Sequence, residues 1–336
     1  MEALLENFWV VLVLKILTVA LLVPVAGLII GYAELKISAH MQARVGPYFA
    51  GGRYGWAQLI ADGLKFFQKE DVIPENADRP VFRWAPVLVL ISAVSLFVVI
   101  PFGPGDAFVV RDLDVGIFFA LAISSVGTLG VLMAGWSSAN KYSLIGGLRA
   151  AGQLIAYELP LVLSVIGVVL LAESMSLNTI VEAQIEWGMP FAIPQFVAFV
   201  IFMIAALAEM SRIPFDMPIA ESELTTGYLT EYTGFRFLFF FLAEFANMFT
   251  FSAIAATLFL GGYAPAGATV FGFEVPALTG PLWLSIKIAL LVFIMIWVRW
   301  TWPRLREDQL QTFAWKWLVP ISLANIIVTA VFKVLL

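Results

Sequence analysis

The chain has 336 residues, of which 61% are hydrophobic and 13% are charged, and its mean hydropathy of +0.94 excludes an ordinary water-soluble domain. Its net charge of −5 does not favour nucleic acid as a partner, and its single histidine leaves little scope for a histidine-bound metal or haem. Because the chain has no cysteine, thiolate-bound iron–sulfur clusters, cysteine zinc sites and disulfides within it are excluded. We therefore expect an all-α, polytopic membrane protein with no metal and no redox centre of its own.

Eight apolar runs are long enough to be membrane spans, since a helix of about 20 residues crosses the hydrocarbon core of a bilayer. The first run has no cation before Lys15, which favours a retained span over a cleaved signal peptide. No internal repeat is evident, so we predict a single integral membrane domain. The expected spans cover about residues 8–31, 84–102, 115–136, 153–172, 192–210, 237–261, 281–302 and 314–335.

Most lysine and arginine residues fall in four regions, at residues 33–83, 139–152, 211–236 and 299–316. Cytoplasmic loops of membrane proteins are enriched in these residues, so we predict that the four regions face the cytoplasm and that both termini face outward. The cytoplasmic loops themselves are expected at about 32–83, 139–152, 211–236 and 303–313.

The first of these loops contains a helix of a second kind. Between residues 56 and 67 apolar side chains recur at helical spacing, while polar side chains occupy the other face. This segment is too short and too charged to span a membrane, so we expect an amphipathic helix in the interface. Its apolar positions are Trp56, Leu59, Ile60, Leu64 and Phe67.

The stretch from Glu209 to Arg236 concentrates carboxylates between two apolar spans, where charged groups are costly to dehydrate. One interpretation is a solvated loop. The prolines and aromatic residues of the stretch instead favour a folded, partly buried segment. Its carboxylates are Glu209, Asp216, Glu221, Glu223 and Glu231, and its cations are Arg212 and Arg236.

Three carboxylates, Glu158, Glu209 and Glu244, lie at the depth of the expected spans. Glu244 follows Arg236 by eight residues, which places it about 12 Å into its helix. Each carboxylate is either a structural partner for Arg149, Arg212 or a tyrosine, or part of a proton relay, because burial raises a carboxyl pKa towards neutrality.

These residues resemble a known family. From Glu209 the sequence reads EMSRIPFDMPIAESEL, and with Gly227, Glu231 and Arg236 it is similar to the signature of the H-subunit family of bacterial proton-pumping NADH:quinone oxidoreductase, respiratory complex I. The mitochondrial counterpart is NADH dehydrogenase subunit 1. Matching segments elsewhere are Glu34-x-Lys36, Gln42-x-Arg44, Asp62-x-x-Lys65, Arg149 through Glu158, and Arg299 through Arg304-x-Arg306.

The resemblance implies a membrane component of the bacterial cytoplasmic (inner) membrane that helps to enclose a quinone chamber and couples quinone reduction to proton translocation. Its partners would be soluble quinone-site subunits, small membrane-arm subunits and the lipid bilayer. Quinone would be the substrate, while NADH, FMN and iron–sulfur clusters would belong to partner subunits.

The resemblance also implies roles for individual residues. The quinone chamber would include Lys36, Gln42, Arg44, Asp62, Lys65, Phe235 and Arg299. The proton relay and coupling group would be Glu158, Glu209, Asp216, Glu221, Glu223, Glu231 and Glu244. The supporting cations would be Arg149, Arg212, Arg236, Arg304 and Arg306.

Two alternative functions remain at this point. A stand-alone ion-coupled carrier would use intramembrane carboxylates equally well. An anchor subunit of a related membrane-bound hydrogenase would need no quinone. A carrier would purify alone, whereas a hydrogenase anchor would copurify with a nickel–iron subunit.

Overall fold

The computed structural model describes residues 8–265 and 279–335, and in these residues every regular element is a helix. The helices of the first half are α2 (Phe8–Met41), α3 (Gln58–Gln68), α4 (Arg79–Ser95), η1 (Leu96–Val98), η2 (Asp106–Phe108), α5 (Gly116–Ser137) and α6 (Lys141–Ala172). Those of the second half are α7 (Leu177–Glu186), α8 (Phe196–Glu209), α9 (Glu221–Leu224), η3 (Gly227–Leu229), α10 (Gly234–Phe259), α12 (Gly280–Thr301), α13 (Glu307–Phe313), the π-helical turn Ala314–Leu318 and α14 (Val319–Leu335).

Seven helices in the described residues are long and apolar enough to cross a membrane, which confirms the all-α polytopic prediction. The one remaining expected span, at residues 192–210, is shorter than predicted, since α8 has only 14 residues. A helix of that length is about 21 Å long, less than the roughly 30 Å hydrocarbon core. Pro194 precedes α8, and Ser211, with φ of 50°, follows it, so the backbone turns away at both ends.

Two helices extend beyond the apolar runs from which they were predicted. Helix α2 continues past residue 31 to Met41, and α6 begins at Lys141 rather than near residue 153. Residues 32–41 contain neither glycine nor proline, so helix α2 continues after its apolar run ends. As a result, Glu34, Lys36 and Arg149 lie on helices rather than in loops.

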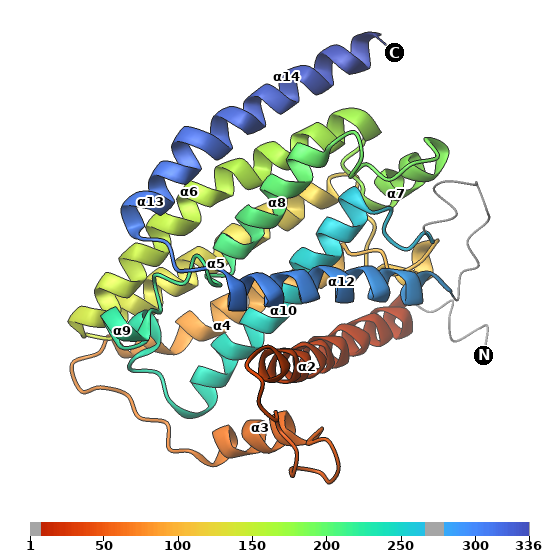
Figure 1. Cartoon of the computed structure of the whole chain (residues 1–336). Helices are drawn as coiled ribbons and strands as arrows, with labels where there is room; N and C mark the ends of the chain where they lie inside the picture. The colour runs from red at the N-terminus through yellow and green to blue at the C-terminus, as the bar shows by residue number, and fades with distance from the viewer. Residues whose placement is uncertain (1–7, 266–278, 336) are drawn as a thin grey trace.

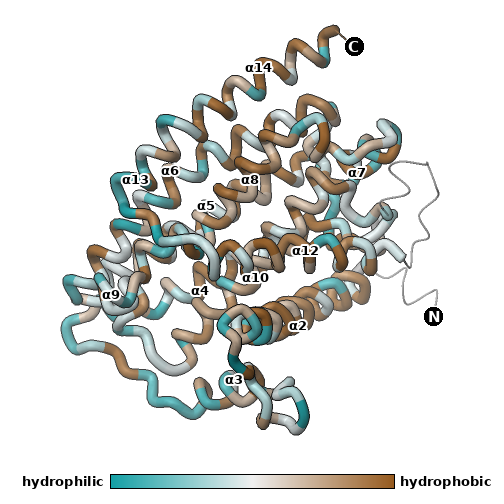
Figure 2. The backbone as a smooth tube through the Cα atoms, in the orientation of Figure 1, coloured by the Kyte–Doolittle hydropathy of each residue, from teal (hydrophilic) through white to brown (hydrophobic). Residues whose placement is uncertain are grey.

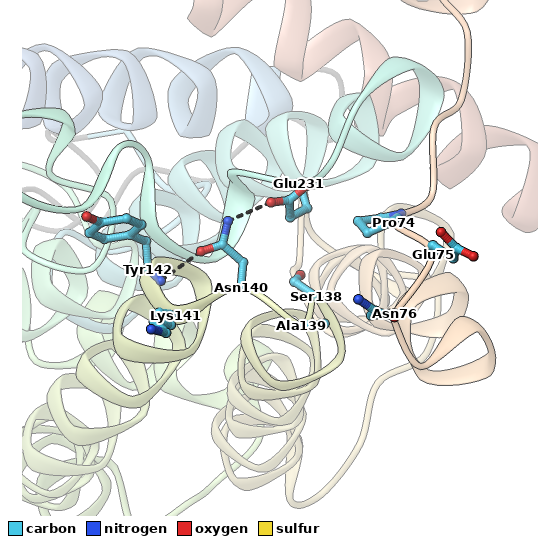
Figure 3. A pocket seen from close by; sticks show the side chains of 9 residues that line it. All are labelled: Pro74, Glu75, Asn76, Ser138, Ala139, Asn140, Lys141, Tyr142 and Glu231. Atoms are coloured by element: carbon cyan, nitrogen blue, oxygen red, sulfur yellow. Dashed lines mark hydrogen bonds between the residues drawn. The ribbon is translucent and has the colours of Figure 1, made fainter.

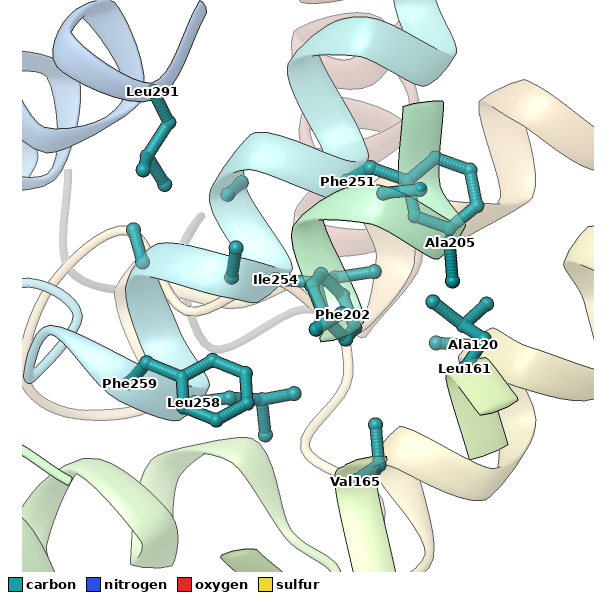
Figure 4. Close-up of a cluster of buried hydrophobic side chains, with 14 of the residues drawn as sticks. Ala120, Leu161, Val165, Phe202, Ala205, Phe251, Ile254, Leu258, Phe259 and Leu291 are labelled. Atoms are coloured by element: carbon teal, nitrogen blue, oxygen red, sulfur yellow. The ribbon is translucent and has the colours of Figure 1, made fainter. Parts of the chain in front are cut away.

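Helix α10 lies at the centre of the bundle and contacts α2, α3, α4, α6, α7, α8 and α12. Its buried aromatic and alanine side chains pack against α8, as the Phe202 and Phe259 rings show with centroids 5.7 Å apart (Figure 4). Leu161 and Val165 of α6 complete this part of the core. The core therefore holds α8 against α6 and α10.

The four regions rich in lysine and arginine contact one another at one end of the bundle. Three ion pairs join them, Arg149–Glu223 at 2.8 Å, Arg236–Asp71 at 2.9 Å and Arg304–Asp216 at 2.9 Å. Helices α3, α9 and α13 lie at this end and α7 at the other (Figure 1). Figure 2 shows that the segment between α3 and α4 is largely hydrophilic.

The amphipathic helix predicted at residues 56–67 is present as α3. It lies outside the bundle, below α2 in Figure 1. Its rings contact the start of α10, with centroid distances of 5.5 Å for Phe66–Phe237 and 4.7 Å for Phe67–Phe235. Leu64 and Phe67 also remain exposed, which suits a helix that rests in the interface.

Helices α5 and α6 approach closely at two glycines. A Cβ atom on Gly135 would lie 2.7 Å from the Ser143 carbonyl oxygen and 2.8 Å from Gly147 Cα. Both distances are shorter than a Cβ atom tolerates, and both opposing atoms belong to the backbone. Small residues thus set the separation of these helices, as is common between membrane helices.

Gly135→Ala should therefore destabilise the protein, because the added methyl group forces α5 and α6 apart. The matched control is Gly152→Ala on the exposed face of α6, where the new Cβ would meet only the end of the Gln311 side chain at 3.7 Å. The amount of assembled protein in membranes and its thermal unfolding midpoint measure both variants. Equal behaviour of the two would contradict the role of the close contact.

Candidate functional site

The central ionic cluster is built around Arg212, which follows the end of α8 and is only 5% exposed. Its Nη1 donates to Glu34 Oε2 of α2 at 2.6 Å, and its Nε lies 2.8 Å from Glu244 Oε1 of α10. Arg299 of α12 forms a further ion pair with Glu34. Two cations and two carboxylates therefore neutralise one another at the meeting point of four segments.

Local structure explains why Arg212 reaches this position. Ser211 adopts a left-handed conformation, and the Arg212 N–H donates to the Leu207 carbonyl at 3.1 Å, so the chain folds back over the end of α8. The guanidinium also lies over the Phe245 ring, 5.0 Å from its centroid. Burial lowers the pKa of Arg212, but Glu244 and Glu34 outweigh this and raise it above its ordinary value. Arg212 therefore remains a cation.

Glu209 faces a small internal cavity and forms no ion pair with any other residue that the structure describes. The cavity has a volume of about 70 Å³ and is lined also by Glu244, Tyr228 and Asn247. Glu209 Oε2 is buried and forms no hydrogen bond within the described part of the chain. Glu158 of α6 is close enough to interact electrostatically with Glu209. A cavity of this size and polarity is large enough to hold a water molecule.

Asp216 follows Glu209 and Arg212 along the acidic stretch and is 9% exposed. Its Oδ2 pairs with Arg304 Nη2 at 2.9 Å. Burial raises the pKa of Asp216 to about 6, even though Arg304 and Arg299 act in the opposite direction. Its pKa therefore lies closer to neutrality than that of an exposed aspartate.

The outer carboxylates of the stretch lie nearer the surface. Glu221 and Glu223 are exposed, and Glu223 accepts a hydrogen bond from Arg149 Nη1 at 2.8 Å. Glu231 accepts from Asn140 Nδ2 at 2.6 Å beside an open polar pocket (Figure 3). The stretch is thus folded and partly buried, with Asp216 inside and Glu221 outside.

The expected quinone-chamber residues fall into two groups. The first group lies on α2, in the loop that follows it and on α3. Gln42 and Arg44 hydrogen-bond to each other at 2.6 Å on an exposed surface, and Lys65 lies 4.0 Å from Asp62. Lys36 donates to the Pro47 carbonyl at 2.5 Å.

The remaining members connect these elements to the rest of the protein. Phe235 packs on Phe67 of α3. Arg299 belongs to the central ionic cluster instead. The expected cations Arg236 and Arg306 pair with Asp71 and Asp308.

Three further residues were not predicted for the site. Glu34 was assigned to a loop because the apolar run ends at residue 31, although it appears in the motif Glu34-x-Lys36. Gln153 donates to the carbonyls of Ala208 and Phe215 at 2.7 and 2.8 Å, and so holds both ends of the turn after α8. Tyr228 lines the cavity of Glu209. Gln153 lies within the matching segment Arg149 through Glu158, whereas Tyr228 has no local sequence signal beyond being polar in an apolar setting.

The sequence matches the family model described as NADH dehydrogenase over residues 14–330. It is 50% identical over 301 residues to the H subunit of NADH-quinone oxidoreductase from Bacillus mycoides (strain KBAB4), covering 90% of this chain and 87% of the relative. The proteins of the same name from Bacillus cereus (strain B4264) and Bacillus thuringiensis subsp. konkukian (strain 97-27) are 49% and 50% identical, with the same coverage.

Removing the central cation should be strongly destabilising. Arg212→Met leaves the buried Glu34 and the partly buried Glu244 with one cation fewer, and breaking a buried pair costs about 3–5 kcal/mol. Adding Glu244→Gln to this variant should recover part of the loss.

The control is Arg306→Met, whose exposed pair with Asp308 should contribute little, because solvent screens it. Thermal inactivation of the assembled protein distinguishes the variants. If Arg212→Met inactivates no faster than Arg306→Met, the central cluster does not hold the helices together.

Proposed function

Because the chain belongs to the NADH dehydrogenase family, we propose that it helps to form the entry to a quinone chamber and couples quinone reduction to proton translocation. Its relatives are named as subunits of NADH-quinone oxidoreductase. Quinone is then the substrate, and NADH, FMN and iron–sulfur clusters belong to partner subunits. Those partners include soluble subunits at the quinone site and small subunits of the membrane arm.

The entry is assigned to the region where α2, α3 and α10 meet. The exposed apolar side chains of α3 offer a surface for an isoprenoid tail, and Gln42, Arg44, Asp62 and Lys65 offer a polar rim for the headgroup. The end of α2 leads from this rim towards Glu34, which pairs with Arg299. This arrangement supports a path from the interface to the central ionic cluster.

One observation carries the coupling proposal: Glu244 pairs with Arg212 and also lines the cavity of Glu209. A change of charge near Glu34 and Arg299 alters the field at Arg212 and, through Glu244, at the buried carboxylates. Glu209 and Glu158 then take up or release protons in response. Asp216, whose pKa is about 6, provides a second proton-binding group on the Arg304 side.

Glu209→Gln tests this assignment, because Gln preserves the shape of the side chain but cannot carry the proton. Quinone reduction and proton pumping should fall together by about ten-fold or more, as expected for loss of a proton-transfer group. NADH oxidation by an artificial acceptor should persist in the assembled complex, since those electrons leave through partner subunits.

The matched control is Glu182→Gln on α7, an exposed carboxylate at the other end of the bundle. It should retain both activities. Normal quinone reduction and pumping in an assembled Glu209→Gln complex would remove Glu209 from the relay.

The orientation of the chain is also part of the proposal, with the four cationic regions towards the cytoplasm. Single cysteines at Tyr142 and Thr179 test it. Both positions are exposed, Tyr142 lies in the first turn of α6 and Thr179 on α7 beyond the far end of α6, and the chain has no other cysteine. An impermeant thiol reagent should label Thr179→Cys in intact cells, and Tyr142→Cys only after permeabilisation. The reverse pattern would invert the topology.

A further inference from the structure

A second, larger hollow lies away from the carboxylates. It is a groove of about 700 Å³ between α8, the end of α12, α13 and the π-helical turn Ala314–Leu318. Its walls include Met203 and Leu207 of α8, Val298 of α12 and Trp317. Of the described residues that line it, only Gln309 and Thr312 contribute amide or hydroxyl side chains. Water would find few hydrogen-bonding partners there, and the volume is within the range of ligand-binding pockets.

The position of the groove indicates what kind of molecule reaches it. Helix α12 and the continuous helical stretch Glu307–Leu335 are long and apolar enough to cross a membrane, while α8 is too short to span the hydrocarbon core, so the groove between them lies at the depth of the acyl chains. Trp302 and Trp317 line it and are 61% and 60% exposed. Tryptophan is enriched where the hydrocarbon meets the headgroups, which places the mouth of the groove at the interface.

Cations lie at this mouth. Lys316 is exposed, immediately precedes Trp317, and has no carboxylate partner among the residues described. Arg304 follows the lining residue Pro303 and is partly exposed in its pair with Asp216. The nearby carboxylates of Glu307 and Asp308 are already paired with Arg149 and Arg306. Lys316 therefore provides an unneutralised positive charge at the level of lipid headgroups.

We propose that this groove binds a phospholipid with an anionic headgroup. One acyl chain lies against Met203, Leu207 and Val298, and the phosphate lies beside Lys316 and Arg304. The same groove is bounded by Pro214 and Phe215, the residues that precede Asp216. Phe215 packs on Tyr157, with ring centroids 5.1 Å apart, so the lipid supports the outer side of the acidic stretch. The binding site does not depend on the role proposed for the carboxylates.

The test uses the purified complex and a phosphatidylglycerol analogue with a photoactivatable group in its acyl chain, with cross-linked peptides mapped by mass spectrometry. Labelling should fall on α8 and on the segment from α13 to α14. Met203→Trp, which fills the groove, should reduce labelling of these peptides by about ten-fold. Val197→Trp, an exposed position on α8 outside the groove lining, should leave it unchanged.

A second pair of variants tests the headgroup. Unlabelled phosphatidylglycerol should compete better than phosphatidylcholine, and Lys316→Gln should reduce that preference about five-fold, as expected for one interfacial cation. Lys316→Arg should retain it. Equal labelling in Met203→Trp and Val197→Trp would overturn the proposal. Absence of labelling in the wild-type complex would also overturn it, because it would mean that a helix of a partner subunit fills the groove. If Lys316→Gln does not change the preference for phosphatidylglycerol over phosphatidylcholine, the lipid is not selected by its anionic headgroup.

Discussion

The buried charge of Arg212 governs how the membrane helices are arranged. A guanidinium that is 5% exposed must be neutralised, because an unpaired cation in a low-dielectric interior is far too costly. Glu34 and Glu244 meet this requirement from α2 and α10, and Arg299 of α12 balances Glu34. The position of three membrane helices is thereby tied to the first residues of the acidic stretch. Any change of charge in the cluster acts on all of them.

Neutral contacts hold the acidic stretch against the bundle and so determine which of its carboxylates lose water. Gln153 binds the carbonyls of Ala208 and Phe215, and a Cβ on Gly146 would lie 2.6 Å from Gly227 Cα, so α6 and the stretch touch through their backbones. Asp216 is consequently buried, while Glu221 lies on the surface. Only dehydrated carboxylates have pKa values near neutrality, which makes the inner members the better candidates for proton exchange.

Helix α8 links the two hollows of the protein. It ends at Glu209, which faces the internal cavity, and its side chains Met203 and Leu207 line the apolar groove. Helix α8 can border both the cavity and the groove because it is short. The chain reverses direction at Ser211 and places Arg212 and Phe215 next to the C-terminal end of the helix. A full-length span would have occupied that space.

The membrane class, the approximate spans, the amphipathic helix and the place of the acidic stretch could all be predicted from the sequence, because each depends on hydrophobicity or periodicity within one segment. That Glu34 is a helical residue could not, since hydropathy marks where apolar residues end and not where the helix ends. The pairing of Arg212 with Glu34, which is 178 residues away, and the unpaired oxygen of Glu209 were equally hidden. These features arise only in the folded chain, because packing selects which distant charges share a buried space and which groups are left without a partner.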